Sequence, residues 1–200
     1  MGSIVAVVGN TGAGKTTLVR ALSRSHKFNL GLEQHTERPF QVLFKRDPKY
    51  ALANQMDYLL QRAKQELDFR NQAGTALVDG GLDLDFHGFT RLFHAKGYLS
   101  EAEFTLCDDL YRFFRSFLPT PDLFIHLIAD NATLVKRLAV RDRINIAEPE
   151  DLELLNLHLM EWLSTLDPVR IITIESSSDD VDFSRAVPDI LDKMISLHII

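Results

Sequence analysis

Residues 9–16 are the segment whose residue types and spacing most clearly indicate chemistry. They follow the apolar run 4–8 and read Gly9-Asn10-Thr11-Gly12-Ala13-Gly14-Lys15-Thr16. This is the spacing G-x-x-x-x-G-K-[ST] of the P-loop (Walker A) motif, whose glycines let backbone N–H groups point at phosphate oxygens. Lys15 would contact the β- and γ-phosphates and Thr16 would bind Mg²⁺, with Thr17 in the next helical position. The segment predicts a nucleoside triphosphate site. The alternative, a glycine-rich turn with an accidental Lys-Thr, is disfavoured because strand, loop and helix occur in the required order.

Two acidic residues come directly after apolar runs. Glu33 follows the run 28–32, and Asp79 ends the run 75–78. The carboxyl ends of parallel strands meet at one sheet edge, so both carboxylates are expected near the P-loop. Glu33 could accept the proton of an attacking hydroxyl, and Asp79 could reach Mg²⁺ directly or through water. The alternatives are an ordinary loop acid for Glu33 and a turn former for Asp79.

The densest basic cluster consists of Arg137, Arg141 and Arg143. Arg137 and Arg141 are four residues apart on one face of an expected helix, and Arg143 follows. Such a cationic flap, over about 137–150, could close on the transferred phosphates and stabilise the charge of a loose transition state. The alternative is a solvated helix face that pairs with Asp142 and Glu148.

Short apolar runs alternate with longer helical stretches along the whole chain. Strands are expected at 4–8, 28–32, 75–78, 123–128 and 169–174. Helices are expected at 15–26, 37–44, 48–73, 82–96, 100–118, 131–141, 152–166 and 183–195. This alternation predicts an α/β fold with a five-stranded parallel sheet flanked by helices, in a single domain over 1–200.

Two of these helical stretches carry apolar side chains at helical spacing. In the first they are Leu52, Leu59, Leu60, Ala63 and Leu67. In the second, the aromatic stripe of Phe113, Phe114 and Phe117 is expected in the core or in a subunit contact.

Composition excludes several other classes of function. The net charge of -6 at pH 7 argues against a nucleic-acid-binding surface, which is usually basic. No apolar segment approaches the ~20 residues that span a bilayer, and the N-terminal run leads into the P-loop rather than to a cleavage site. The single cysteine, Cys107, suits a reducing compartment and is expected to be a packed thiol. These features predict a soluble cytoplasmic protein without nucleic-acid or membrane partners.

Several separate segments together resemble the deoxynucleoside kinases, particularly the bacterial deoxyadenosine/deoxyguanosine type. The matching residues are Glu33 and Pro39, Phe44, Asp47-Pro48, Gln55, Leu59, Arg62, Pro121-Asp122-Leu123 and Arg141-Asp142-Arg143. The resemblance implies the P-loop kinase fold, Glu33 as general base for a nucleoside 5′-hydroxyl, and Gln55 as a hydrogen-bonding partner of the nucleobase. It also implies lid roles for Arg141 and Arg143, a place for Asp79 beside the substrate, and a homodimer.

Two positions depart from the family's pattern. Where the family has Asp/Glu-Arg-Ser, this chain has Asp79 followed by Gly80-Gly81, so the arginine that helps hold the catalytic Glu and the 5′-oxygen is missing. Arg38 and Arg91 are the candidates for replacing its charge. The aromatic residue that usually offers a hydroxyl to the sugar 3′-position is Phe44, which has none.

The leading expectation is ATP-dependent phosphorylation of the 5′-hydroxyl of a (deoxy)nucleoside, with Mg²⁺ and with Glu33 as general base. Because of the two departures, two alternatives stay open. One is a P-loop kinase for another small hydroxyl substrate. The other is a nucleotide-binding family member that has lost kinase activity.

Overall fold

The centre of the molecule is a five-stranded sheet in which every neighbouring pair of strands is parallel. The computed structural model describes residues 1–32, 38–140, 147–177 and 182–200. The strand order is β2-β3-β1-β4-β5, and the strands are β1 Ser3–Gly9, β2 Asn29–Gly31, β3 Thr75–Asp79, β4 Leu123–Ile128 and β5 Ile171–Glu175. This confirms the predicted α/β class. The P-loop therefore follows the central strand, with β3 and β4 on its two sides.

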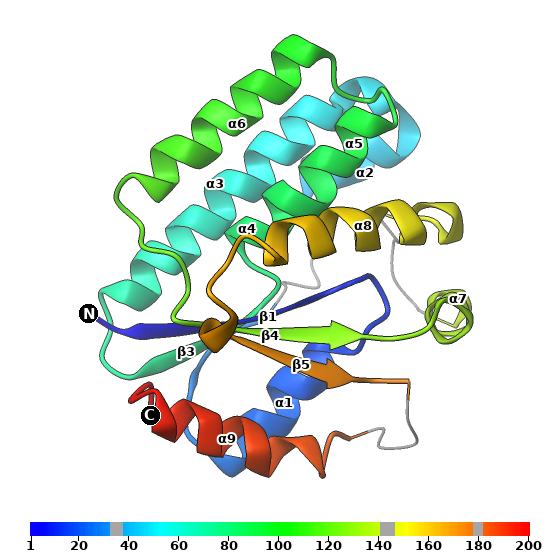
Figure 1. Cartoon of the computed structure of the whole chain (residues 1–200). Coiled ribbons are helices and arrows are strands. Elements are labelled where there is room, and N and C mark those ends of the chain that lie inside the picture. Colours follow the sequence, from blue (N-terminus) through cyan, green and yellow to red (C-terminus); the bar gives the residue numbers. More distant parts are fainter. Residues whose placement is uncertain (33–37, 141–146, 178–181) are drawn as a thin grey trace.

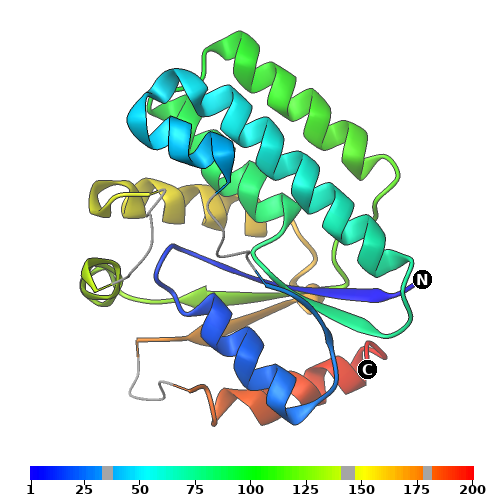
Figure 2. The ribbon, with the colours of Figure 1, turned by 180° about the vertical axis from the view of Figure 1, so that it is seen from behind.

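Helices cover both faces of the sheet, as Figures 1 and 2 show from opposite sides. On one face, α1 (Lys15–Ser25) and α9 (Ala186–Ser196) share an apolar cluster with the inner strands. On the other face lie α3 (Ala51–Arg70), α6 (Glu101–Arg115) and α8 (Leu152–Leu163). The sheet is buried on both sides, which explains the nearly continuous apolar runs of β1, β3 and β4.

The segment before α3 is a helical hairpin whose turn chemistry is visible in the sequence. Helix α2 spans Pro39–Arg46, and a 3₁₀ turn, η1, spans Pro48–Tyr50. Each begins with proline, whose fixed φ and missing N–H suit a first helical position. Between them, Asp47 accepts a hydrogen bond from the backbone N–H of Lys49 at 3.0 Å, which caps the 3₁₀ turn.

The predicted helix over 82–96 has three parts: α4 (Leu82–Leu84), a π-helical turn η2 (Asp85–Thr90) and α5 (Arg91–Ala95). The expected start of the next helix is confirmed, because Ser100 and Glu103 form a complete capping box before α6. Cys107 on α6 is fully buried, and burial raises the pKa of its thiol to about 11. The thiol is packed, as expected.

The remaining helical elements follow β4 or come directly before α8 and β5. They are α7 (Asn131–Ala139), which follows β4, and two 3₁₀ turns, η3 (Pro149–Asp151) and η4 (Pro168–Arg170). Asp130 caps α7 by accepting a hydrogen bond from the backbone N–H of Thr133 at 2.8 Å, which lowers the pKa of Asp130 to about 2. Among the described helices, none has the length and apolar character needed to cross a membrane.

Helices α3 and α6 expose some of their large apolar side chains, and α3 buries several polar and charged ones. Leu60 and Leu67 are each 43% exposed, and Phe113 is 62% exposed. The inner face of α3 instead carries polar and charged residues that are almost completely buried: Asn54, Gln55, Arg62, Glu66 and Arg70. The periodicity therefore predicted the helix, but the apolar spacing gave no sign that polar and charged side chains line its buried face.

Candidate active site

The P-loop leaves β1 through a backbone turn that depends on glycine. Gly9, Gly12 and Gly14 have φ values of 146°, 84° and 96°, in the region that side-chain-bearing residues rarely adopt. A Cβ on Gly9 would lie 2.5 Å from the carbonyl oxygen of Leu127 on β4. Glycine at the first motif position is thus required by the close approach of two neighbouring strands as well as by the loop's curvature.

Asn10 braces the loop from within. Its Nδ2 donates to the carbonyl oxygen of Leu152 at 2.8 Å, and its Oδ1 accepts from the backbone N–H of Thr11 at 2.8 Å. The backbone N–H of Ala13 donates to the Asn10 carbonyl at 3.2 Å. Because Asn10 is only 5% exposed, these bonds hold the loop against the first turn of α8 in a fixed shape.

The residues that end the motif lie in the first turn of α1. Lys15 Nζ donates to the carbonyl oxygens of Gly9 and Asn10 at 3.0 and 2.9 Å, so its charge lies over the loop. Thr16 Oγ1 donates to Asp79 Oδ2, while Thr17 is exposed on the next helical position. The loop therefore brings an ammonium group and the positive end of a helix to one place, an arrangement that suits phosphate.

Asp79 reaches the P-loop because β3 lies directly beside β1. Val7 is paired with Asp79 in the register of the two strands, and the N–H of Gly80 donates to the Val7 carbonyl at 2.9 Å. The Asp79 side chain is almost completely buried. A carboxylate next to a hydroxyl is a set of hard oxygen donors that fits Mg²⁺, so Asp79 and Thr16 are the described residues that could hold this ion.

Arg137 connects the P-loop to the end of β5. From α7, its Nη1 donates to the Gly12 carbonyl at 3.3 Å and its Nη2 to the Ser176 carbonyl at 2.6 Å. The guanidinium thus already lies against the phosphate loop. Glu33, Arg141 and Arg143 lie outside the described residues, so their places in the site stay predictions.

The inner face of α3 supplies a second polar surface. Gln55, 2% exposed, accepts a hydrogen bond at its Oε1 from the hydroxyl of Thr90 at 2.9 Å. Two turns further along, Arg62 Nε donates to Asp85 Oδ2 at 2.8 Å in a buried ion pair. An α-helix rises about 1.5 Å per residue, so these two groups are separated by roughly 10 Å along the helix.

Arg62 places a positive charge beside Gly80. A Cβ built on Gly80 would lie 3.4 Å from Arg62 Nη2, so the guanidinium lies beside the turn after Asp79. The two arginines considered from sequence are held elsewhere, Arg38 by Asp57 at 2.5 Å and Arg91 by Glu161 at 2.5 Å. The expectation that Arg38 or Arg91 replaces the missing arginine is therefore not supported. Arg62, part of the family pattern, is the better candidate.

Phe44 on α2 is packed in the core against α5 and the residues that follow it. Its ring centroid lies 4.6 Å from that of Phe93 and 5.8 Å from that of Tyr98, and the side chain is 7% exposed. The ring can contribute an apolar wall to a substrate site. A hydrogen bond to a sugar would have to come from another residue.

Sequence reasoning missed a buried charge cluster behind Asp79. Arg115 on α6 makes two bidentate pairs, with Glu66 at 2.7 and 3.0 Å and with Asp83 at 2.7 and 3.0 Å. Tyr111 donates its hydroxyl to Asp83 at 2.7 Å. The backbone N–H of Leu82 points at Glu66 Oε1, 3.4 Å away, so the cluster supports the turn that carries Asp79.

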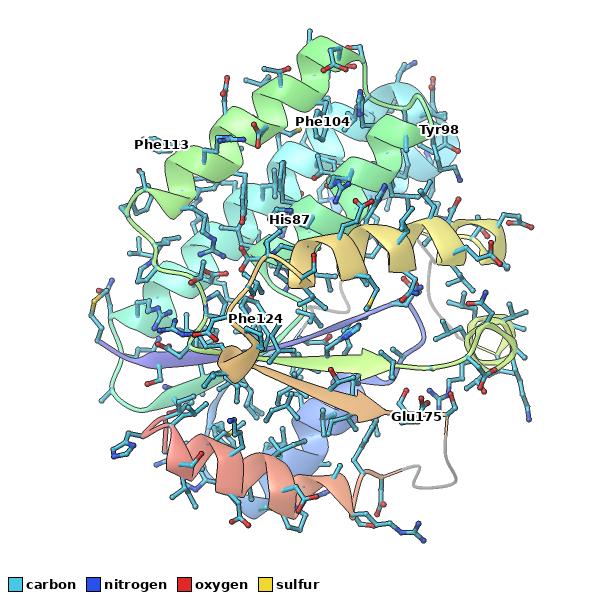
Figure 3. All side chains as sticks on the ribbon, viewed as in Figure 1. His87, Tyr98, Phe104, Phe113, Phe124 and Glu175 are labelled. Carbon is cyan, nitrogen blue, oxygen red and sulfur yellow. The ribbon has the colours of Figure 1, made fainter. Side chains whose placement is uncertain are left out.

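His87 borders this cluster and is neutral at neutral pH. Burial lowers its pKa to about 4. Its Nε2 lies 3.1 Å from the Tyr111 hydroxyl, and its ring stacks on Trp162 of α8 at 5.1 Å. Figure 3 shows His87 between the upper helices and α8, so it joins the helical layer to the helix that braces the P-loop. These contacts indicate a structural role for His87.

A P-loop after the central strand, an acid at the end of the neighbouring strand and an all-parallel sheet between helices define the class of P-loop α/β nucleotide-binding proteins. The family model described as "Deoxynucleoside kinase" matches residues 5–199. The chain therefore belongs to the deoxynucleoside kinase family, which confirms the resemblance stated from its motifs.

Two curated relatives and several solved structures are similar to the chain. A deoxyadenosine/deoxycytidine kinase of Bacillus subtilis (strain 168) is 26% identical over 144 residues, covering 70% of this chain and 66% of the relative. A deoxyadenosine kinase of Dictyostelium discoideum is 28% identical over 143 residues, covering 71% of this chain and 58% of the relative. These matches thus span about three fifths to two thirds of the relatives' lengths.

The solved structures agree in fold over nearly the whole chain. A deoxyadenosine kinase from M. mycoides, with the products dCMP and dCDP bound, has a TM-score of 0.82 at 21% identity and covers 96% of this chain and 99% of its own. The same enzyme with bound dATP has a TM-score of 0.80, also at 21% identity, covering 96% of this chain and 98% of its own. At this identity the likeness establishes the fold.

Proposed function

We propose that this chain transfers the γ-phosphoryl group of ATP to the 5′-hydroxyl of a (deoxy)nucleoside. The observation that carries the proposal is the meeting of two surfaces around the carboxyl end of β3. One consists of the P-loop with the Thr16–Asp79 pair, and the other is the buried polar face of α3 with Gln55 and Arg62. The first suits a triphosphate donor and the second a polar acceptor. Membership of the deoxynucleoside kinase family supports the same reaction.

On the donor side, the loop N–H groups and Lys15 would hold the phosphates of ATP. Mg²⁺ held by Thr16 and Asp79 would neutralise charge that develops on the phosphate oxygens. Arg137, which already contacts the Gly12 carbonyl, is close enough to the loop to contact bound phosphate. With Arg141 and Arg143 it would form the cationic flap that excludes water and so limits hydrolysis.

On the acceptor side, Glu33 would take the proton of the 5′-hydroxyl. Thr90 occupies Oε1 of Gln55, which leaves the amide nitrogen of Gln55 to recognise the nucleobase. Arg62, held in place by Asp85, would supply beside Gly80 the positive charge that the Gly-Gly turn cannot. The names of the relatives indicate that deoxyadenosine and deoxycytidine are the acceptors to test first.

Replacing Glu33 with glutamine is expected to lower the rate of nucleoside phosphorylation by roughly 10²–10⁴-fold, because general-base catalysis contributes that much. The measurement is a coupled ATP assay against a panel of nucleosides, run beside Glu153→Gln. Glu153 is exposed on α8, so this control should keep the native rate.

Each result of that panel decides between the proposal and its alternatives. Phosphorylation of a deoxynucleoside that is lost in Glu33→Gln supports the proposal. Turnover only on other hydroxyl compounds would identify a P-loop kinase of different specificity. Stabilisation by ATP without turnover on any acceptor would identify a nucleotide-binding member that has lost the activity.

We also propose that the chain forms a homodimer through the outer faces of α3 and α6. The large apolar side chains exposed on these two neighbouring helices, and in the turn directly after α6, are Leu60, Leu67, Leu106, Phe113 and Phe117. Within α3 and within α6 they recur at spacings of seven and four residues, so each set shares one helical face. Figure 3 shows Phe113 on the side of α6 turned away from the sheet. Large apolar side chains exposed on neighbouring helices are typical of an interface.

Placing a charge at this surface with Phe113→Glu is expected to shift the protein from dimer to monomer at micromolar concentration, because an unpaired charge is costly to bury. Sedimentation velocity measures the change. The matched control is Leu157→Glu on α8, where the side chain is 53% exposed but lies on a different face. A native protein that sediments as a monomer would refute this interface.

A further inference from the structure

Asn54 is a buried amide without a partner. The residue is 0% exposed, and neither Nδ2 nor Oδ1 has a hydrogen-bond partner in the described parts of the chain. Buried polar side chains in native proteins are nearly always hydrogen-bonded, because an unsatisfied group loses its bonds to water without compensation. Asn54 leaves a donor and an acceptor unsatisfied at once, so it calls for an explanation.

The position of Asn54 places it on the side of α3 that faces α2. The hairpin pairs Arg38, just before α2, with Asp57 on α3, and at its closed end Phe44 and Ala51 belong to one apolar cluster. Asn54 lies midway between Ala51 and Asp57. It is therefore inside the hairpin, level with the middle of α2, where solvent does not reach it.

Asn54 is also next in sequence to Gln55, the amide proposed to recognise the nucleobase. Successive residues on an α-helix point about 100° apart, so the two amides cannot reach the same part of one ligand. Gln55 is held by Thr90 on η2, while Asn54 is turned toward α2. The two amides would thus contact different portions of a single nucleoside.

The chemistry of Asn54 matches a hydroxyl group. An amide can accept one hydrogen bond and donate another, and a sugar hydroxyl can donate and accept in return. Phe44, the aromatic side chain that α2 contributes nearby, carries no polar atom. Among the described residues on this side of α3, Asn54 is accordingly the one whose side-chain donor and acceptor both have no hydrogen-bond partner.

We propose that Asn54 is a substrate-binding residue that hydrogen-bonds the 3′-hydroxyl of the acceptor's sugar and so determines specificity for nucleosides that carry this group. The assignment rests on the proposed function, since it requires a nucleoside acceptor. Entry of the sugar would separate α2 slightly from α3, and satisfying the buried amide favours this opening. Asn54 then acts in substrate binding, whereas its unsatisfied amide lowers the stability of the ligand-free protein.

The test compares native protein, Asn54→Leu and Asn54→Ala in two measurements. Calorimetry gives the dissociation constants for deoxyadenosine and deoxycytidine and for their 2′,3′-dideoxy analogues. Thermal unfolding without ligand gives stability. Asn54→Leu removes the unsatisfied polar atoms while keeping a branched side chain, and Asn54→Ala guards against overpacking. Asn156→Leu, at an exposed position on α8, is the matched control.

The native protein should bind the preferred deoxynucleoside at least about tenfold more tightly than its dideoxy analogue, and the Asn54 variants should lose most of this preference. At least one Asn54 variant should unfold at or above the native temperature, because in the free protein the amide makes no hydrogen bond whose loss would destabilise the fold. Equal loss of affinity for both compounds, unchanged affinity, or failure of both variants to fold would each overturn the assignment. Absence of any nucleoside binding by the native chain would instead refute the proposed function, and this assignment with it.

Discussion

Replacing Lys15 with alanine is expected to lower phosphoryl transfer by roughly 10²–10³-fold while the protein stays folded. The loss follows from the geometry of the P-loop, where Lys15 Nζ lies over the Gly9 and Asn10 carbonyls at 3.0 and 2.9 Å. From there it can move onto phosphate oxygens, whose charge grows in the transition state. Removing one preorganised donor from such a centre typically costs that factor in turnover. The measurement is kcat at saturating ATP and deoxynucleoside.

The matched control is Lys27→Ala, since Lys27 is exposed just beyond the end of α1. Lys27→Ala should retain native turnover and native stabilisation by ATP. Lys15→Ala should unfold near the native temperature without ligand but be stabilised less by ATP, because the variant has lost a contact to the phosphates. Turnover by Lys15→Ala within about tenfold of native would contradict the placement of the donor phosphates at this loop.

The P-loop could be predicted in detail because its geometry is encoded locally. Eight contiguous residues after a strand determine the turn, and Gly9 must be glycine for a reason that a neighbouring strand supplies. Asp79 could be placed almost as well, since parallel strands bring their carboxyl ends to one edge. By contrast, no pattern indicated that Arg62 lies beside Gly80, because that contact depends on how α3 crosses the sheet.

The same distinction holds for the helices. Pro39 and the Ser100–Glu103 capping box marked helix starts to within about two residues, since these signals act within one turn. The buried face of α3 could not be read from hydrophobicity. Glu66 is buried because Arg115, 49 residues further along the chain, supplies its partner. Burial of charge depends on tertiary neighbours, which residue spacing on one helix does not reveal.

Replacing Arg115 with methionine is expected to destabilise the protein by about 3–5 kcal/mol, because it leaves two buried carboxylates without their cation. The side chains of Glu66 and Asp83 are only 2% and 3% exposed, and each shares two hydrogen bonds with Arg115. Burial already raises the pKa of Glu66 with the arginine present. Urea unfolding at a fixed protomer concentration measures the loss, since a dimer's apparent stability depends on concentration.

The pH dependence of that loss has a definite sign. Without Arg115, the pKa of Glu66 should rise further above its value in the unfolded chain, so the folded variant binds a proton more readily than the unfolded one. Its stability is then highest below the unfolded pKa and falls as pH rises through the folded pKa, which makes the deficit larger at pH 8 than at pH 5.

Arg112→Met on the same helix removes an exposed pair with Asp108 and should change little. Adding Glu66→Gln and Asp83→Asn to Arg115→Met should recover part of the stability, because the buried groups are then uncharged. A deficit as small as that of Arg112→Met, or one that grows toward low pH, would show that the cluster is not what holds α6 to the turn after Asp79.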